Sequence, residues 1–260
     1  MNTWNMETHD ELIQHQTSMS SINLRGNISR ENMQEDLPPS DLGTKIHWER
    51  AYDEEIANFK DHGDVGDVWF GEGITRKMVT WISDNIGPEE GILDVGTGNG
   101  VTLIRLKEKG FRKLKGIDYS AQAVELARMV ASSTAATGSG EETAEILFEQ
   151  KDILSGDSCE GSPFKVIIDK GTYDAISLNP DIPFVQSKQL YKKFIETNIE
   201  ENGFFMLTSC NWTRQELENH FILQEDTAKF EVVHEIPTPS LSFGGTSGRN
   251  VTSIVFRYQK

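Results

Sequence analysis

The stretch GILDVGTGNG, residues 91–100, places three glycines at alternate positions directly after a short apolar run that ends in an acid. The apolar run at residues 91–95 predicts a buried strand. Glycine has no side chain, so a turn of this kind lets the backbone approach a bulky polar ligand. The pattern that follows predicts a helix from Asn99 to Lys109, ended by Gly110.

Strand-like and helix-like segments alternate through most of the remaining chain. The predicted strands are residues 91–95, 113–118, 145–150, 164–169, 203–209, 230–236 and 251–258, with helices at 99–109, 120–134 and 188–200 and from Thr213. Such alternation is typical of a parallel sheet covered on both faces. The last two strands have no helix between them, so we expect them to pair antiparallel. The sequence predicts an α/β fold, with a Rossmann-like seven-stranded mostly parallel sheet and a C-terminal antiparallel hairpin.

The N-terminal part of the chain has a different composition. Residues 1–40 are rich in Ser, Asn, Gln, Glu and Met and show no sustained period. Such a segment buries too little apolar surface to order itself, so we expect a disordered leader, with a poorly specified helix around residues 9–16 as the alternative. Residues 41–260 are expected to form one domain. It begins with a helix at 45–60, a glycine-punctuated loop at 63–73 and a second helix that ends at Gly87-Pro88.

The composition limits the possible partners. With 41 acidic against 25 basic residues the formal net charge is −16, which argues against direct nucleic-acid binding, because phosphates favour a basic face. The charge is compatible with a basic protein substrate. The two cysteines, Cys159 and Cys210, have no metal-like spacing, so we expect no disulfide framework, no metal site and a reducing compartment. No apolar stretch approaches the roughly 20 residues that span a bilayer, so we expect no membrane contact. We also expect a cytoplasmic location and a monomeric state.

The glycine spacing separates two kinds of cofactor. A nicotinamide-binding fingerprint is G-x-G-x-x-G, whose third glycine packs the helix onto the strand. Here that third position is Val101. The tighter G-x-G-x-G spacing after an acid fits the methionine end of S-adenosylmethionine better. We therefore expect a cofactor loop that consists of Asp94, Gly96, Thr97, Gly98, Asn99 and Gly100, in which the acid holds the loop or meets the cofactor's ammonium group through water.

Acids after the next two strands support this interpretation. Asp118, followed by Tyr119, ends the second strand, where a ribose favours a carboxylate acceptor. Asp152 follows the third strand, where an acid can accept from the adenine amine while Ile153 packs against the ring. Each acid alone could be a helix cap or a turn residue. Because open α/β sheets bind ligands at the carboxyl ends of their strands, we interpret the acids together as one cofactor site.

The segment IIDKGTYDAISLNPD, residues 167–181, leaves the fourth strand at the edge of the expected cofactor pocket. Nucleic-acid and glutamine amino-methyltransferases commonly place an Asn/Asp-Pro-Pro-aromatic tetrad at this point. This chain has Asp169-Lys170-Gly171-Thr172-Tyr173 and lacks both prolines. The difference argues against adenine, cytosine or glutamine as a methyl acceptor.

Seven segments together resemble one family. They are LGTKIHWERAY (42–52), GDVGDVWFG (63–71), LDVGTGNGV (93–101), GIDYS (116–120), DKGTYDAISLNPD (169–181), GFFMLTSCNWT (203–213) and PTPSLSFGG (237–245). The chain resembles the protein-lysine methyltransferases that modify translation elongation factor 1-alpha, the methyltransferase-like family with the signature DKGT[FY]DAISL. The resemblance runs from about Ser40 to the C-terminus; Tyr173 stands where Phe is also usual, and the leader and the loop 135–143 lie outside the pattern. It implies the class I methyltransferase fold and an S-adenosylmethionine-dependent protein-lysine N-methyltransferase with elongation factor 1-alpha as its partner.

The resemblance also implies roles for residues near the methyl acceptor. The attacking lysine must be neutral although its ordinary pKa is about 10.4. Asp169, beside the cofactor, is expected to orient the amine and accept its proton through water; alternatively it is structural and accepts backbone N–H bonds. We expect Tyr173, Trp212 and Phe243 to line the lysine channel, because aromatic faces suit an alkylammonium group, and Tyr173 to act in catalysis. Core packing is the alternative for all three.

Three further residues are candidates around the pocket. Trp48, with Tyr52, is expected to fold over the cofactor as a lid, and Trp69 could close the same pocket; core packing is again the alternative. Asn211 could bond to the substrate backbone, or could cap the helix that starts near Thr213.

Two other functions compete with lysine methylation of a protein. The same core serves small-molecule methyltransferases, which would need a closed pocket instead of an open lip. The chain could also be an inactive cofactor-binding scaffold that acts through its leader. The intact glycine loop does not exclude a scaffold, although no motif looks decayed.

Overall fold

The computed structural model describes residues 37–135, 145–222, 229–238, 240–243, 246–249 and 251–259, except for the side chains of Ala135 and of residues 240–249. The expected leader, residues 1–40, therefore lies outside the described residues apart from its last four, as does the expected loop 135–143 apart from Ala135. Leu37 already packs against the core, and the backbone N–H of Ser40 donates to the carbonyl oxygen of Leu178 at 3.1 Å. The described domain thus begins slightly before the expected boundary at residue 41.

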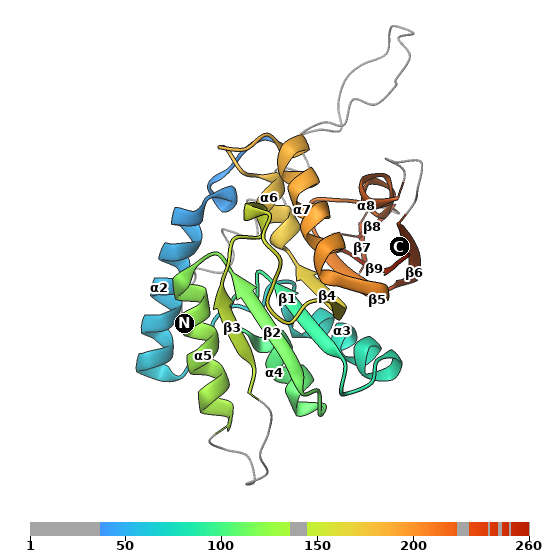
Figure 1. Ribbon diagram of the computed structural model, residues 1–260. Helices are drawn as coiled ribbons and strands as arrows, with labels where there is room; N and C mark the ends of the chain where they lie inside the picture. The colour runs from blue at the N-terminus through green and yellow to red at the C-terminus, as the bar shows by residue number, and fades with distance from the viewer. Residues whose placement is uncertain are drawn as a thin grey trace, which may run out of the picture. The chain divides into compact units, whose positions relative to one another are not determined.

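Seven strands form one sheet in the order β3-β2-β1-β4-β5-β9-β6, which runs through the middle of the domain (Figure 1). The strands are β1 (Gly91–Val95), β2 (Lys113–Asp118), β3 (Leu147–Gln150), β4 (Phe164–Lys170), β5 (Ile199–Ser209), β6 (Phe230–Glu235) and β9 (Thr252–Tyr258). Strands β1 to β5 pair in parallel, whereas β9 pairs antiparallel with both β5 and β6. The predicted fold class is confirmed.

Helices cover both faces of the sheet. One face, here called the α5 face, carries α2 (Lys45–His62), α3 (Gly71–Asn85), α4 (Val101–Glu108) and α5 (Ala121–Ala135), and the other, the α7 face, carries α6 (Thr172–Ser177), α7 (Phe184–Asn198) and α8 (Arg214–Phe221). Strand side chains alternate between the two cores: Ile92 and Ile168 lie on the α5 face, and Leu93 and Ile167 on the α7 face. Helix α2 packs alongside α5 at the β3 side of the sheet (Figure 1).

The strand order reverses at β1. Strands β2 and β3 lie on one side of it, and β4 and the later strands lie on the other. Open α/β sheets bind ligands outside the carboxyl ends of the strands at such a switch point. The glycine loop leaves β1 at this point, and Asp118 ends β2 beside it. The fold therefore brings the predicted cofactor motifs to one edge of the sheet.

Two parts of the chain differ from the expectation. The short helix α6 follows β4 almost at once, because the carboxylate of Asp169 accepts hydrogen bonds from the backbone N–H groups of Thr172 and Tyr173 in its first turn. The connection between β6 and β9, in which the sequence analysis predicts no helix or strand, contains β7 (Ser240–Phe243) and β8 (Thr246–Arg249), which pair antiparallel. Both features depend on contacts that strand and helix periodicity does not encode.

Candidate functional site

The glycine loop has a left-handed backbone at three positions. Gly96, Gly98 and Gly100 have φ angles of 63°, 54° and 74°, a region in which residues with a side chain are strained. A Cβ atom at Gly96 would lie 1.9 Å from Oγ1 of Thr172, and one at Gly98 would lie 2.8 Å from Oη of Tyr52. The glycines are therefore required by close contacts within the chain itself, in addition to any approach by a ligand.

Asp94 lies buried at the base of this loop. Its Oδ2 accepts a hydrogen bond from Oγ1 of Thr97 at 2.9 Å, and its other oxygen makes no hydrogen bond within the described residues. Burial raises the pKa of Asp94 to about 6, against the opposing effects of the Lys170 charge and the Thr97 hydrogen bond. Asp94 thus holds the loop, as one of the two predicted roles requires, and retains an oxygen for a ligand.

Asp118 joins the end of β2 to the glycine loop. Its two oxygens accept hydrogen bonds from the backbone N–H of Gly98 at 3.1 Å and from that of Ser120 at 3.0 Å. Burial raises the pKa of Asp118 to about 6 and, aided by the neighbouring carboxylate of Asp118, raises that of the half-buried Tyr119. The acid and the loop are therefore adjacent, as the sequence predicts.

The third acid of the predicted site has a weaker connection to the pocket. Asp152 is exposed and caps the short 3₁₀ helix η3 (Ile153–Ser155), where its Oδ1 accepts from the backbone N–H of Leu154 at 2.8 Å. Ile153 is buried. The backbone N–H of Lys151 donates to the carbonyl oxygen of Asp118 at 2.8 Å, which holds this turn next to β2. Asp152 thus acts as a turn residue, which was the alternative to a cofactor-binding acid. Its turn nevertheless lies beside the end of β2, where the cofactor site is expected.

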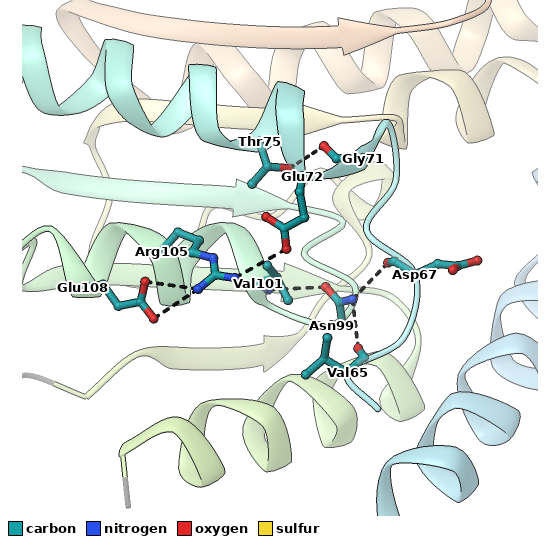
Figure 2. A network of polar contacts seen from close by, with 9 residues as sticks. All are labelled: Val65, Asp67, Gly71, Glu72, Thr75, Asn99, Val101, Arg105 and Glu108. Atoms are coloured by element: carbon teal, nitrogen blue, oxygen red, sulfur yellow. Dashed lines mark hydrogen bonds and ion pairs between the residues drawn. The ribbon is translucent and has the colours of Figure 1, made fainter. Parts of the chain in front are cut away.

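Asn99 connects the glycine loop to the segment between α2 and α3 (Figure 2). Its Nδ2 donates to the carbonyl oxygens of Val65 at 3.1 Å and Asp67 at 3.0 Å. Its Oδ1 accepts from the backbone N–H of Val101 at 3.3 Å. In the same network Arg105 pairs with Glu72 and Glu108 on the surface. Both ends of the Asn99 carboxamide thus bind the chain itself, and they fasten the 63–70 segment beside the loop.

The three aromatic residues of the expected lid lie together. The ring centroid of Trp48 lies 6.1 Å from that of Tyr52 and 5.3 Å from that of Trp69. Nε1 of Trp48 donates to the carbonyl oxygen of Leu42 at 2.8 Å, which fixes the indole. Because Oη of Tyr52 approaches Gly98 closely, this cluster borders the glycine loop, as the expectation of a lid requires.

Glu55 is a residue of this region that the sequence analysis does not single out. Its Oε1 accepts from the backbone N–H of Asp67 at 3.2 Å, and its Oε2 is buried without a partner among the described residues. Burial raises the pKa of Glu55 to about 7, and the charges of Asp67 and Asp64 contribute. Helical periodicity cannot identify such a residue, because its partner belongs to the following loop.

Replacement of Glu55 by Gln is expected to stabilise the protein at pH 8. Burial holds the pKa of Glu55 at about 7 in the folded state, above its ordinary value of 4.5. The contribution of Glu55 to stability is therefore present at low pH and is lost as pH rises from about 4.5 to about 7. Gln keeps the acceptor for the Asp67 N–H without the charge. We expect a gain of roughly 1–3 kcal/mol in the free energy of unfolding at pH 8, several times smaller at pH 5. Urea unfolding at the two pH values measures this gain. The control is Glu54→Gln, at an exposed neighbouring position. Equal gains at both pH values would contradict the raised pKa of Glu55.

Asp169 does not share the face of Asp94 and Asp118. It is fully buried on the α7 face, where it accepts hydrogen bonds from the backbone N–H groups of Thr172 at 2.9 Å and Tyr173 at 3.0 Å and from Oη of Tyr191 at 2.5 Å. Burial raises its pKa to about 7, against the lowering effect of the Tyr191 hydrogen bond. These contacts favour the structural alternative for Asp169 over the expected role beside the cofactor and in catalysis.

The two described aromatics of the expected lysine channel pack in the core of the α7 face. Tyr173 is fully buried, and its Oη lies 2.9 Å from Nδ1 of His220. Trp212 is 4% exposed and stacks on Phe184 with ring centroids 5.1 Å apart. These contacts favour core packing, the alternative to the expected catalytic role, as the interpretation of Tyr173. The side chain of Phe243 lies outside the described residues.

Asn211 and Trp212 follow a rigid turn at the carboxyl end of β5. The carboxylate of Asp174 accepts from Oγ of Ser209 at 2.5 Å and from the backbone N–H of Cys210 at 2.8 Å. Oγ of Ser209 accepts in turn from the backbone N–H groups of Asn211 and Trp212. Asp174 lies within the recognised signature, but its role in holding a turn more than thirty positions away becomes visible only in the fold.

Two side-chain donors of this turn have no partner among the described residues. Nδ2 of Asn211 and Nε1 of Trp212 are buried, and neither makes a hydrogen bond within the described part of the chain. Asn211 does not cap α8: Thr213 does so, in a capping box with Glu216. A buried donor without a partner is unfavourable by about 1–3 kcal/mol, so these two atoms suit a carbonyl oxygen supplied from outside the described chain.

The described residues show neither a metal cluster nor a membrane helix. No group of three or more His, Cys, Asp or Glu side chains among them is arranged to hold a metal ion. None of the described helices is both long and apolar enough to cross a bilayer.

The described site fits S-adenosylmethionine. The buried Asp94 has an oxygen available for an ammonium group, and Asp118 is held against the glycine loop at the point where a ribose would need an acceptor. Such a loop and acid, at the switch point of a seven-stranded sheet, define a Rossmann-like methyltransferase domain. A family model described as a methyltransferase domain matches residues 86–255.

Relatives narrow the class further. The chain is 41% identical over 220 residues to EEF1A lysine methyltransferase 2 of Homo sapiens, covering 84% of this chain and 87% of that protein. It is 37% identical over 234 residues to Protein-lysine N-methyltransferase EFM4 of Saccharomyces cerevisiae, covering 85% of this chain and 96% of that protein. The chain belongs to the family of these lysine methyltransferases, which confirms the resemblance found in the sequence.

Solved structures agree on the fold. Magnesium protoporphyrin IX methyltransferase from Synechocystis PCC 6803 with bound SAH superposes with a TM-score of 0.58 at 13% identity, over 84% of this chain and 100% of that chain. At this identity the similarity shows the shared fold alone.

Proposed function

We propose that this chain is an S-adenosylmethionine-dependent protein-lysine N-methyltransferase that methylates a lysine of elongation factor 1-alpha. The observation that carries the proposal is the buried pair of Asp94 and Asp118 on the glycine loop at the switch point. The substrate follows from the names of the relatives, which this chain matches over more than four fifths of their length. A cytoplasmic location and a monomeric state belong to the same proposal.

The residues of the chain have separate tasks in this reaction. Bound S-adenosylmethionine would supply an electrophilic methyl group on its sulfonium. The residues that would hold it are Asp94, Gly96, Thr97, Gly98, Asn99, Gly100, Asp118, Tyr119, Asp152 and Ile153. The cluster of Trp48, Tyr52 and Trp69 would exclude water, and water exclusion lowers the pKa of an attacking lysine. Most of the acceleration would come from positioning the amine, so no strong general base is required.

Asn211 and Trp212 are the proposed substrate contacts. Their donors, which have no partner among the described residues, lie on the turn that follows β5 and is held by Asp174. Strand β5 is paired with β4. We assign Nδ2 of Asn211 and Nε1 of Trp212 to carbonyl oxygens of the substrate backbone. A protein substrate supplies such oxygens on both sides of its lysine, whereas most small acceptors do not.

The test is methyl transfer from labelled S-adenosylmethionine to purified elongation factor 1-alpha, followed by mass spectrometry. We expect one labelled lysine with the wild type. Asn211→Ala should raise the KM for the protein substrate about three- to tenfold, the value of one neutral hydrogen bond, with unchanged affinity for S-adenosylhomocysteine.

The control for this variant is Asn219→Ala, on the exposed surface of α8, which should leave the KM unchanged. The same reaction is also run with a cell lysate in place of the purified substrate. Label found only in low-mass material would contradict a protein substrate and favour a small-molecule methyltransferase. Cofactor binding without any transfer would favour an inactive scaffold.

A further inference from the structure

Lys170 is a cation at the centre of an otherwise acidic site. The last in-register pair of β1 and β4 is Val95 with Asp169, so Lys170 lies beside Gly96, where the glycine loop begins. Side chains alternate along a strand, and Ile168 lies in the core of the α5 face. Lys170 therefore projects to the same face as Asp94, opposite to its neighbour Asp169.

The ammonium group of Lys170 has little to bind in the described chain. Its Nζ donates to the carbonyl oxygen of Trp69 at 3.4 Å, a long hydrogen bond. No carboxylate oxygen of the described residues lies within the 4.0 Å of an ion pair, although the charges of Asp94, Asp169 and Glu72 act on it. An ammonium group has three donors, so the described residues use only part of its hydrogen-bonding capacity.

Lys170 is half-buried, so its ammonium group is partly removed from water in the protein alone. This burial lowers the pKa of Lys170 below the usual value for lysine, because a charge removed from water needs a partner. Asp94, on the same face, also has one oxygen without a hydrogen bond to any described residue. The base of the glycine loop therefore presents one carboxylate and one ammonium group on the same face of the sheet, two register positions apart, and neither is fully bonded by the described residues.

The methionine end of the proposed cofactor has the complementary pattern. Its α-carbon carries one ammonium and one carboxylate group. We propose that Lys170 binds the α-carboxylate of the cofactor while Asp94 binds the α-ammonium. The inference rests on the proposed function for the identity of the cofactor. The inference adds Lys170 as a cofactor-binding residue, which the glycine spacing does not indicate. Lys170 also donates a hydrogen bond to the backbone of the loop that carries Trp69.

The experiment compares three ligands by calorimetry. They are S-adenosylhomocysteine, its decarboxylated analogue 5′-deoxy-5′-(3-aminopropylthio)adenosine, and 5′-methylthioadenosine, which lacks the whole amino-acid end. Lys170→Met keeps the length of the side chain and removes the charge. We expect it to weaken binding of S-adenosylhomocysteine about ten- to hundredfold, as for a hydrogen bond to a charged group, and to leave the other two affinities within about twofold.

Two further variants complete the comparison. Asp94→Asn should weaken binding of both amine-bearing ligands and leave 5′-methylthioadenosine unchanged. Lys77→Met is the matched control, because Nζ of Lys77 also donates to a backbone carbonyl oxygen, that of Pro237 at 2.6 Å; it should change none of the affinities.

Each contrary result has a separate meaning. If Lys170→Met weakens all three ligands equally, Lys170 only supports the loop of Trp69, and the proposal is wrong. If it weakens none, the carboxylate lies elsewhere, and the proposal is also wrong. If the wild type binds none of the three, the cofactor assignment of the proposed function fails instead.

Discussion

Replacement of Gly96 by Ala is expected to abolish cofactor binding. The new Cβ would lie 1.9 Å from Oγ1 of Thr172, far inside van der Waals contact. Thr172 cannot move away easily, because that Oγ1 donates to the carbonyl oxygen of Val95 at 2.8 Å and its backbone N–H donates to Asp169. The glycine loop must shift instead, and a displacement of about 1 Å at such a site reduces activity by about a hundredfold. Methyl transfer should fall by at least this factor, and calorimetry with S-adenosylhomocysteine should detect no binding.

Gly110→Ala is the matched control for this prediction. Gly110 also has a left-handed backbone, with φ of 92°, but a Cβ there meets nothing within 4 Å. Both variants therefore share the backbone strain of roughly 1–2 kcal/mol, and only Gly96→Ala adds the clash. Unchanged affinity in Gly96→Ala would mean that the loop adapts, and the steric account would be refuted. A partial recovery in the double variant Gly96→Ala, Thr172→Ala would support it directly.

Replacement of Asp169 by Asn is expected to reduce stability more than it reduces catalysis by folded enzyme. The amide nitrogen of Asn cannot accept from the backbone N–H of Tyr173 or from Oη of Tyr191, which now bind the carboxylate. Removal of a buried charge whose pKa is raised to about 7 is favourable at pH 8, but the loss of these hydrogen bonds is larger, so we expect the free energy of unfolding at pH 8 to fall by about 1–3 kcal/mol. Urea unfolding measures this change.

Tyr191→Phe serves as the comparison, because it removes one of these hydrogen bonds and keeps the carboxylate. Its expected loss is smaller, about 1–2 kcal/mol. The competing view assigns a catalytic role to Asp169. That view would be supported if Asp169→Asn unfolded like the wild type while kcat fell at least a hundredfold at saturating substrate and cofactor, and the structural interpretation would then be wrong.

Much of the fold and of the cofactor loop follows from local properties of the sequence. The alternation of strands and helices determines a parallel sheet, and the missing helix before residues 251–258 determines the antiparallel end. The glycine spacing is also a local signal, because a left-handed backbone excludes most other residues. The role of Asp118 is also predictable from a local signal, because the sequence pattern shows where the second strand ends.

The roles of the residues after β4 depend on contacts across the fold. Asp169 and Lys170 are neighbours in the recognised signature, yet they face opposite sides of the sheet, and only the packed helices show which side carries the glycine loop. Tyr173 could equally line a channel until His220 is placed 2.9 Å from its hydroxyl. The type of side chain limits the possible chemistry, but its task is set by partners that lie tens of residues away along the chain, and those partners are brought together only when the sheet and its two helical layers pack.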